Sequence, residues 1–235
     1  MSRLLRSELL KVQTIRTFGW IALANIALVL IAAVSVAASS GAFQSVDDHR
    51  GAAQIAGSAL VLALISGIIV MAGEARHGTI TQTLLVTPVR ERVLLVKVAV
   101  AAVIGLVLAL LAEALVLLVL VPASLDVDKA RGVLIGILVG APLAAALGVG
   151  LGALVHAQGA AIGMSLAWLL IGEGLMPAIS ETATKYTPGR SFGALASGVR
   201  HGDQVLGAVG GAVAAAVWTA VFVAAGLLAL LGRDV

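Results

Sequence analysis

Long apolar runs separated by charged residues dominate the pattern of this chain. Four runs contain no Asp, Glu, Lys or Arg: residues 17–46, 51–73, 132–172 and 204–232. A fifth run, 98–125, contains a single charged residue, Glu113. An α-helix needs about 20 apolar residues to cross the hydrocarbon core of a bilayer. Because these runs are continuous rather than alternating, they predict membrane-spanning helices and not strands.

The run 132–172 is long enough for two helices, and its polar break at residues 156–159 predicts a tight turn between them. The chain is therefore expected to cross the membrane six times. The predicted spans lie at about 18–38, 54–73, 98–121, 132–154, 160–178 and 205–231. The predicted fold class is an all-α polytopic membrane protein that forms a single transmembrane domain over residues 1–235.

The composition agrees with this class. Hydrophobic residues make up 60% of the 235 residues and charged residues only 11%, whereas about a quarter of an average soluble domain is charged. So little charge cannot cover a water-exposed surface, which excludes a water-soluble enzyme. The chain has no cysteine, its four histidines lack metal-ligand spacing, and it has no basic stripe with interleaved aromatic residues. We therefore expect no metal site and no binding of nucleic acid.

The distribution of Lys and Arg predicts the orientation in the membrane. The segments 1–17 and 74–97 and the C-terminal tail together carry nine of these residues, and the segments on the other side carry six. Cytoplasmic segments carry an excess of Lys and Arg, so both termini are expected in the cytoplasm. The expected location is the plasma (inner) membrane of a bacterium.

Residues 1–17 precede the first span and have an amphipathic pattern. Leu5, Leu9 and Val12 fall at i, i+4 and i+7, and Arg3 and Arg6 occupy the other side. This pattern predicts an interfacial helix that lies in the headgroup layer, with its cations near anionic lipid. The alternative is a short basic leader that only sets the topology.

The segment between the second and third spans contains a helical pattern of its own over residues 78–87. Ile80, Leu84 and Thr87 fall at i, i+4 and i+7, Thr79 can cap the start of the helix, and Pro88 stops it. An exposed apolar ridge in the cytoplasm needs a partner surface. That surface is either another protein or the ends of the chain's own spans.

The residues around this short helix resemble those of permease subunits of type-two, export-type ABC transporters. The matching features are Glu74, Gly78-Thr79, Leu84-Leu85, Thr87-Pro88 and the cations Arg90, Arg92 and Lys97. In that family the corresponding segment is a coupling helix that seats in a cleft of the ATPase subunit. The resemblance implies ATPase contact or loop shaping for seven residues: Glu74, Arg76, Gly78, Thr79, Leu84, Pro88 and Arg90.

The resemblance also implies the partners. No G-x-x-x-x-G-K-[ST] sequence is present, so a separate ATPase subunit would bind ATP and Mg, and this chain would hold no cofactor and no catalytic residue. The family arrangement is two permeases, here a homodimer in membrane lipid, with two ATPase subunits and a pathway between the permeases. The implied function is ATP-driven export. An apolar or amphipathic substrate, drug-like as in multidrug efflux or lipid-like, suits the apolar spans best.

Two carboxylates lie inside predicted spans, Glu113 in the third and Glu173 near the outer end of the fifth. A charge at the bilayer centre is unfavourable, so each should face protein or a water-filled cavity. One interpretation is a cation or substrate contact in the transport pathway. The other is a protonated packing group for Glu113 and an interfacial residue in water for Glu173.

The fourth span carries small residues at every fourth position, which predicts close packing against another helix. These residues are Gly132, Gly136, Gly140, Ala144, Gly148 and Gly152. The outer connection 179–204 is half apolar. Its residues 191–199 predict a short re-entrant helix, as the exporter family often has, and the alternative is a plain extracellular loop.

Two other functions remain open for a protein of this class. An ion-coupled secondary transporter would have internal repeats with broken helices in matching places, and residues 1–121 and 122–235 show no clear repeat. An intramembrane enzyme would need ionisable residues that converge at one depth, and only Glu113 and Glu173 offer that.

Overall fold

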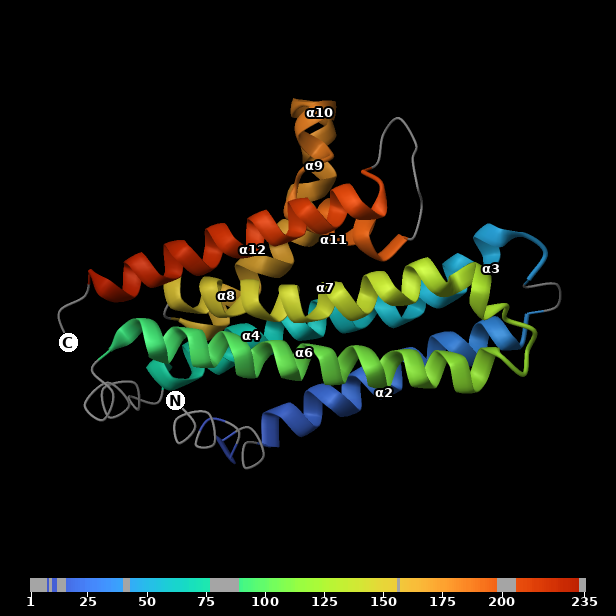
Figure 1. The fold of residues 1–235 in the computed structure, drawn as a ribbon, viewed down its shortest axis with the longest axis horizontal. Coiled ribbons are helices and arrows are strands. Elements are labelled where there is room, and N and C mark those ends of the chain that lie inside the picture. Colours follow the sequence, from blue (N-terminus) through green and yellow to red (C-terminus); the bar gives the residue numbers. More distant parts are fainter. Residues whose placement is uncertain are drawn as a thin grey trace.

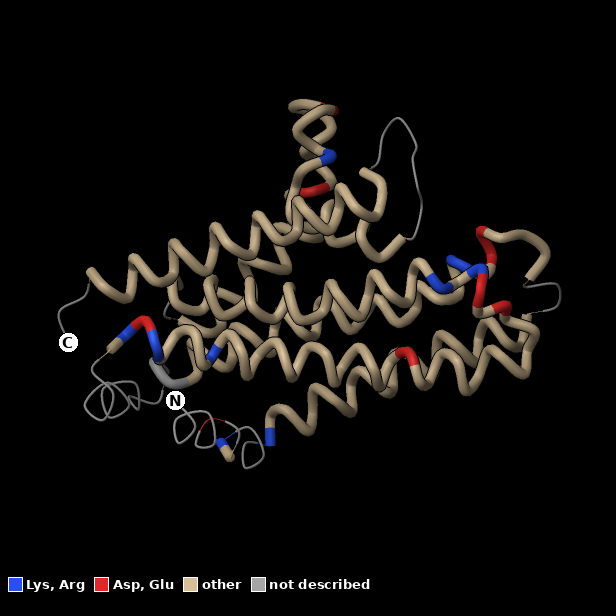
Figure 2. The backbone as a smooth tube through the Cα atoms, in the orientation of Figure 1, with Lys and Arg blue, Asp and Glu red and all other residues tan. Residues whose placement is uncertain are grey.

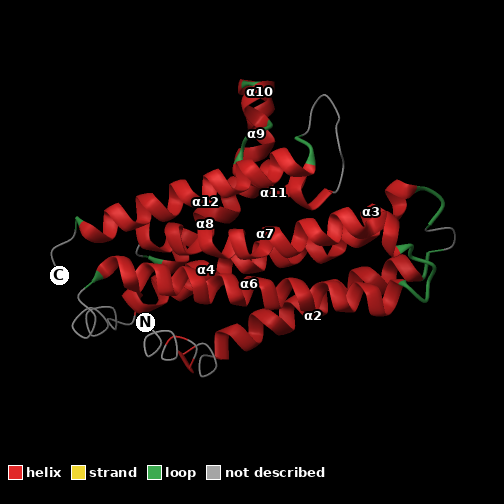
Figure 3. Ribbon diagram, in the orientation of Figure 1, coloured by secondary structure: helices red, strands yellow, loops and turns green. Residues whose placement is uncertain are grey.

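The computed structural model describes residues 8, 10–11, 16–39, 43–76, 89–155, 157–197 and 206–232, with the backbone alone for 74–76. Every regular element in these ranges is helical, and no strand occurs among them (Figure 3). The prediction of an all-α fold is confirmed. Continuous apolar sequence satisfies its backbone hydrogen bonds within each helix, which is the arrangement that lipid requires.

Six helical stretches in the described residues are long and apolar enough to cross a membrane, as the sequence predicted. They are α2 (Arg16–Ala37), Val46–Gly73, α6 (Arg90–Leu120), α7 (Val127–Leu154), Gln158–Ile179 and α12 (Ala208–Leu231). The second stretch combines α3 (Val46–Ala53), the 3-10 turn η1 (Gln54–Gly57) and α4 (Ser58–Arg76). The fifth combines α8 (Gln158–Ala167), a π-helical turn η2 (Trp168–Gly172) and α9 (Glu173–Ile179).

Two helices begin earlier than the apolar runs that predicted them. The second stretch starts at Val46 rather than at residue 54, because Ser45 and Asp48 form a capping box at the start of α3. Helix α6 starts at Arg90 rather than at residue 98. Charged residues continue a helix beyond the hydrocarbon core, so the length of an apolar run underestimates the length of the helix.

Helix α7 is the centre of the bundle and packs against α4, α6, α12 and α11 (Pro188–Ser197) (Figure 1). Glycines allow three of these contacts to be very close. A methyl group on Gly105 of α6 would overlap the backbone of Ala141, and one on Gly150 would overlap the backbone of Phe222 in α12. A methyl group on Gly148 would overlap the carbonyl oxygen of Leu64 in α4. Small residues let spanning helices approach backbone to backbone, where dispersion attraction is strongest.

The predicted small-residue seam of α7 faces two different neighbours. Gly148 and Gly152 lie against α4, whereas Gly136 lies against the backbone of Leu195 in α11. Gly132 is exposed, so it takes no part in the seam. The seam therefore begins one turn later than its sequence period suggests, at Gly136.

Among the described residues, charges gather at the two ends of the bundle (Figure 2). The exceptions are Glu113 in α6 and the charges of the segment that runs from α9 through α10 (Glu181–Thr184) into α11. The basic end, as we call it, carries Lys11, Arg16, Arg90, Arg92 and Lys97. The opposite, mixed end carries Asp47, Asp48, Arg50, Asp126, Asp128, Lys129 and Arg131. Helix α2 begins and α12 ends at the basic end (Figure 1).

The fifth stretch is the least embedded of the six. In its most apolar 18-residue segment only 6% of the residues are buried, compared with 67% in the corresponding segment of α7. After the π turn, α9 and α10 project away from the bundle (Figure 1), and α11 then returns to pack on α7 and α12. The predicted outer connection 179–204 thus contains a helix, α11, that is buried against protein at Ser191, Ala194, Leu195 and Ala196.

Candidate functional site

Most residues of the expected coupling segment lie outside the described part of the chain. These are Gly78, Thr79, Leu84 and Pro88, together with the predicted helix 78–87. Glu74 and Arg76 belong to the last turn of α4, where only the backbone is described. Much of the predicted interfacial segment 1–17 is also outside the description, although Glu8, Leu10 and Lys11 are helical.

Arg90 is the one expected coupling residue whose side chain is described, and it joins two distant helices. Its Nη1 donates hydrogen bonds to the carbonyl oxygens of Leu230, at 2.7 Å, and Leu231, at 3.3 Å. The last carbonyls of a helix have no partner within the helix and carry its negative dipole end, so a guanidinium there is favourable. Arg90 therefore fastens the start of α6 to the end of α12.

A buried ion pair lies nearby at the same basic end. Lys97 of α6 is 0% exposed, and its Nζ donates to Glu8 Oε2 at 3.0 Å and to the carbonyl oxygen of Val70 in α4 at 3.2 Å. Glu8 Oε1 accepts from Lys11 Nζ at 2.6 Å. A buried charge is tolerated when it is paired and hydrogen-bonded. This cluster connects the N-terminal segment to α4 and α6, the two helices that flank residues 77–88.

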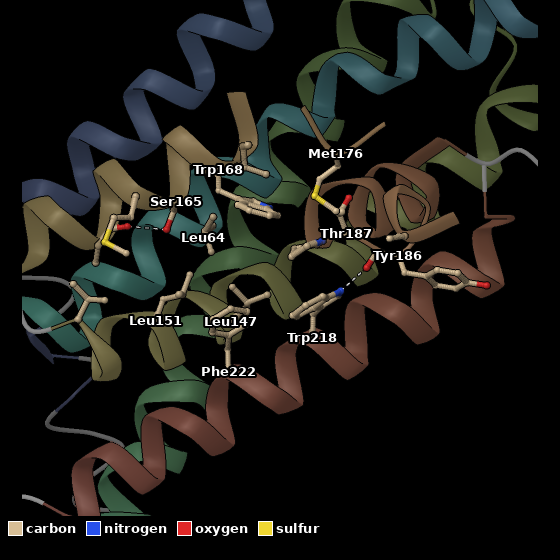
Figure 4. Close-up of a pocket in the computed structure, with 16 residues that line it drawn as sticks. Leu64, Leu147, Leu151, Ser165, Trp168, Met176, Tyr186, Thr187, Trp218 and Phe222 are labelled. Carbon is tan, nitrogen blue, oxygen red and sulfur yellow. Dashed lines mark hydrogen bonds between the residues drawn. The ribbon is translucent and has the colours of Figure 1, made fainter. Parts of the chain in front are cut away.

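An apolar cavity of about 610 Å³ lies between the bundle and the loosely packed fifth stretch (Figure 4). Leu64 of α4, Leu147 and Leu151 of α7, and Phe222 of α12 contribute to the side formed by the bundle. The fifth stretch and the segment that follows it contribute Ala161, Met164, Ser165, Trp168, Leu169, Met176, Ala183, Tyr186, Thr187 and Pro188. Because Met164 and Trp168 are 61% and 42% exposed, the cavity opens sideways, past the fifth stretch.

The π turn of the fifth stretch forms part of the cavity wall, to which it contributes Trp168 and Leu169. In a π turn each N–H bonds to the carbonyl five residues earlier, and such turns are frequent at functional sites. Here the turn directs Trp168 into the cavity (Figure 4). Gly172 lies directly beneath the indole, where a Cβ atom would be 2.7 Å from Trp168 Cε3. A glycine at 172 is thus needed for this orientation of the indole.

The cavity is open to the surroundings past the fifth stretch, where Met164 and Trp168 are exposed. Molecules from the surroundings can therefore enter it, and its walls decide which molecules are suitable.

The two intramembrane carboxylates do not line this cavity. Glu173 is buried, and its Oε1 accepts a hydrogen bond from the backbone N–H of Gly189, in the first turn of α11. It thereby stabilises the N-terminal end of that helix, where a carboxylate is favourable. Glu113 is buried in α6, and its Oε1 has no hydrogen-bond partner among the described residues.

Three features of the site escaped the sequence analysis. The sequence analysis used Lys97 as a basic residue of a cytoplasmic segment and of the family resemblance, and it gave Trp168 and Trp218 no part in a site. Asn25, the single amide within α2, is fully buried and donates from Nδ2 to the carbonyl oxygen of Leu108 in α6 at 2.9 Å. An asparagine in an otherwise apolar span was the one signal that indicated a specific contact.

A polar cluster closes the mixed end. His49 of α3 is buried and stacked on Phe43, and its Nδ1 accepts from the backbone N–H of Asp126 at 3.1 Å. Asp126 caps α7 by accepting from the N–H of Asp128, and its carboxylate lies 3.3 Å from Lys129 Nζ. The hydrogen bond from Lys129 lowers the pKa of the Asp126 carboxyl below its usual value.

Comparison with known proteins does not assign this chain to a family. The sequence matches no protein-family model, and no curated protein is significantly similar to it. The structure by itself supports a helical, multi-pass membrane protein with an apolar cavity in its bundle.

Proposed function

We propose that this chain is the permease subunit of an ATP-driven ABC exporter that moves an apolar or amphipathic molecule outward across the plasma membrane of a bacterium. The observation that carries the proposal is the apolar cavity of about 610 Å³ between the bundle and its loosely packed fifth stretch. This volume is within the range of small-molecule sites, about 300–1,000 Å³. The proposed energy source is ATP hydrolysis by a separate subunit, which the resemblance of residues 74–97 to an export-type permease implies.

Helix α4 connects the proposed coupling segment with the cavity. Residues 77–88 connect α4 with α6, and α4 contributes Leu64 to the cavity wall. A partner ATPase that pushes on the 78–87 helix would therefore act on α4 directly. Two sets of hydrogen bonds would transmit that motion to the rest of the bundle. Lys97 bonds to Glu8 and Val70, and Arg90 bonds to the end of α12.

The resemblance to export-type permeases implies the proposed assembly, and the sequence itself contains no phosphate-binding loop that could bind ATP. Two ATPase subunits would bind ATP and Mg, and two copies of this chain would form the permease dimer in membrane lipid. The basic end would face the cytoplasm, because Lys and Arg collect there. The chain itself would perform no covalent chemistry.

Co-purification of an ATPase tests the proposal. We expect the tagged chain, extracted in mild detergent, to bring with it an ATPase encoded beside it, and the pair to transport substrate in liposomes only with ATP. Leu84→Glu, on the apolar ridge of the predicted coupling helix, should abolish co-purification. Gln82→Ala, on the opposite side of that helix, should not. Retained transport in Leu84→Glu, or the absence of any bound ATPase, would contradict the proposal.

One observation favours a second candidate, an ion- or proton-coupled transporter. Glu113 is buried in a spanning helix, and its Oε1 has no hydrogen-bond partner among the described residues. Intramembrane carboxylates of this kind commonly mark ion or proton pathways. Under this alternative a pH gradient without ATP would drive uptake into liposomes, and Glu113→Gln would abolish that uptake. An ATP-driven exporter would show neither effect.

A further inference from the structure

Three of the polar side-chain groups that line the cavity already bond to the protein, and the indole N–H of Trp168 is a further donor in the wall. Ser165 Oγ donates to the carbonyl oxygen of Ala161 at 2.7 Å, and Thr187 Oγ1 donates to that of Thr184 at 3.0 Å. Trp218 Nε1 donates to the carbonyl oxygen of Tyr186 at 2.6 Å (Figure 4). These three donors therefore have no free N–H or O–H group to offer a ligand.

None of the described residues that line the cavity is charged. Glu173 lies close in sequence to Trp168 and Met176, but its carboxylate is turned to the backbone of Gly189. The Tyr186 ring points away from the cavity in Figure 4 and is 53% exposed. Water needs two to four polar partners in a buried site, and a sugar or an ion needs more. With the indole N–H of Trp168 as its one further side-chain donor among the described lining residues, the wall favours a ligand that is mostly hydrocarbon.

The volume limits how much hydrocarbon can be held. One small molecule such as water takes about 30 Å³ of a liquid, so a cavity of about 610 Å³ holds on the order of 20 carbon-sized groups. That is enough for one long alkyl chain. The sideways opening past Met164 and Trp168 gives such a chain direct access from the bilayer.

We propose that this cavity binds the alkyl tail of a single-chain amphiphile, which enters from the bilayer beside η2 and is held inside one subunit. The inference deepens the proposed transport function, since it names the substrate class. It also moves the binding site from the interface between two permeases into each copy of the chain. Trp168 and Trp218 contact the chain from two sides, and the polar head stays outside the cavity.

Photolabelling tests the inference with the purified chain in nanodiscs and with no ATPase present, so its outcome does not depend on the coupling proposal. The probe is palmitic acid with a diazirine near the end of its chain. We expect saturable labelling of peptides that contain Leu151 or Trp168. Leu151→Phe, which fills part of the cavity, should reduce this labelling several-fold. Leu118→Phe, on the exposed face of α6, should leave it unchanged.

A second variant guards against simple misfolding. Gly172→Ala forces the Trp168 indole from its place and should shift the labelled positions while the unfolding temperature stays near that of the parent chain. Labelling confined to outward-facing residues such as Leu118, or equal labelling of Leu151→Phe and the parent, would overturn the inference. A phospholipid carrying the same diazirine that labels the cavity as strongly, and that excess palmitic acid does not displace, would also overturn it.

Discussion

The buried pair of Glu8 and Lys97 gives a quantitative prediction. Its Nζ–Oε2 distance is 3.0 Å, which corresponds to about 5 kcal/mol of attraction at an effective dielectric constant of about 20, before desolvation is subtracted. Removing one member of a buried pair costs about 3–5 kcal/mol, because the other charge stays buried. Glu8→Gln leaves Lys97 fully buried without this carboxylate, so we expect the free energy of unfolding to fall by about 3–5 kcal/mol.

Replacing Lys97 instead of Glu8 should lower the stability less. Lys97→Met leaves Glu8 in contact with Lys11, whose side chain is 40% exposed and reaches Glu8 Oε1 at 2.6 Å. Only hydrogen bonds to a charged group are lost, about 1.5–3 kcal/mol. The double variant should lose less than the sum of the two single variants, because neither buried charge remains without its partner.

Thermal unfolding in detergent, followed by tryptophan fluorescence, measures these effects. At about 2–4 °C per kcal/mol for a chain of this length, Glu8→Gln should lower the unfolding temperature by on the order of 10 °C, and Lys97→Met by less. Glu91→Gln removes an exposed acid from α6 and should change stability by no more than about 0.5 kcal/mol. The reasoning is refuted if Glu8→Gln behaves like Glu91→Gln, or if the two single changes simply add.

Three further predictions concern packing, pH and the cavity wall. Gly148→Ala should lower stability by about 1–3 kcal/mol through overlap with α4, whereas Gly163→Ala, with open space around it, should be neutral or slightly stabilising in the same melts. Asp126 has a lowered pKa, so its contribution is present above its unfolded pKa of about 3.9 and is lost as the pH falls through the folded value. Melting curves from pH 6 to pH 2 should therefore fall more steeply for the parent than for Asp126→Asn, and parallel curves would contradict this. Trp218→Phe removes the hydrogen bond to Tyr186 and should destabilise by about 0.5–1.5 kcal/mol, whereas an unchanged melt would exclude a stabilising role for that bond.

Hydropathy alone determined the fold class and the number of spans, because a bilayer imposes one strict condition on every segment that crosses it. Uninterrupted apolar sequence of sufficient length must become a helix, since lipid offers no other partner for the backbone. The break at residues 156–159 separated α7 from α8 for the same reason. Glycines at every fourth position also identified most of the close-packed face of α7, because only small residues permit that approach.

Tertiary structure decided which face of each helix meets protein and which meets lipid. A spanning helix is apolar all round, so polarity does not distinguish its faces as it does in a soluble protein. For this reason the cavity beside Trp168, the π turn in its wall and the docking of α11 on Gly136 left no trace in the hydropathy pattern. Lys97 shows the same limit for charge: its position next to an apolar run suggested a group near water, and only the approach of Glu8 from the far N-terminal segment allows it to be buried.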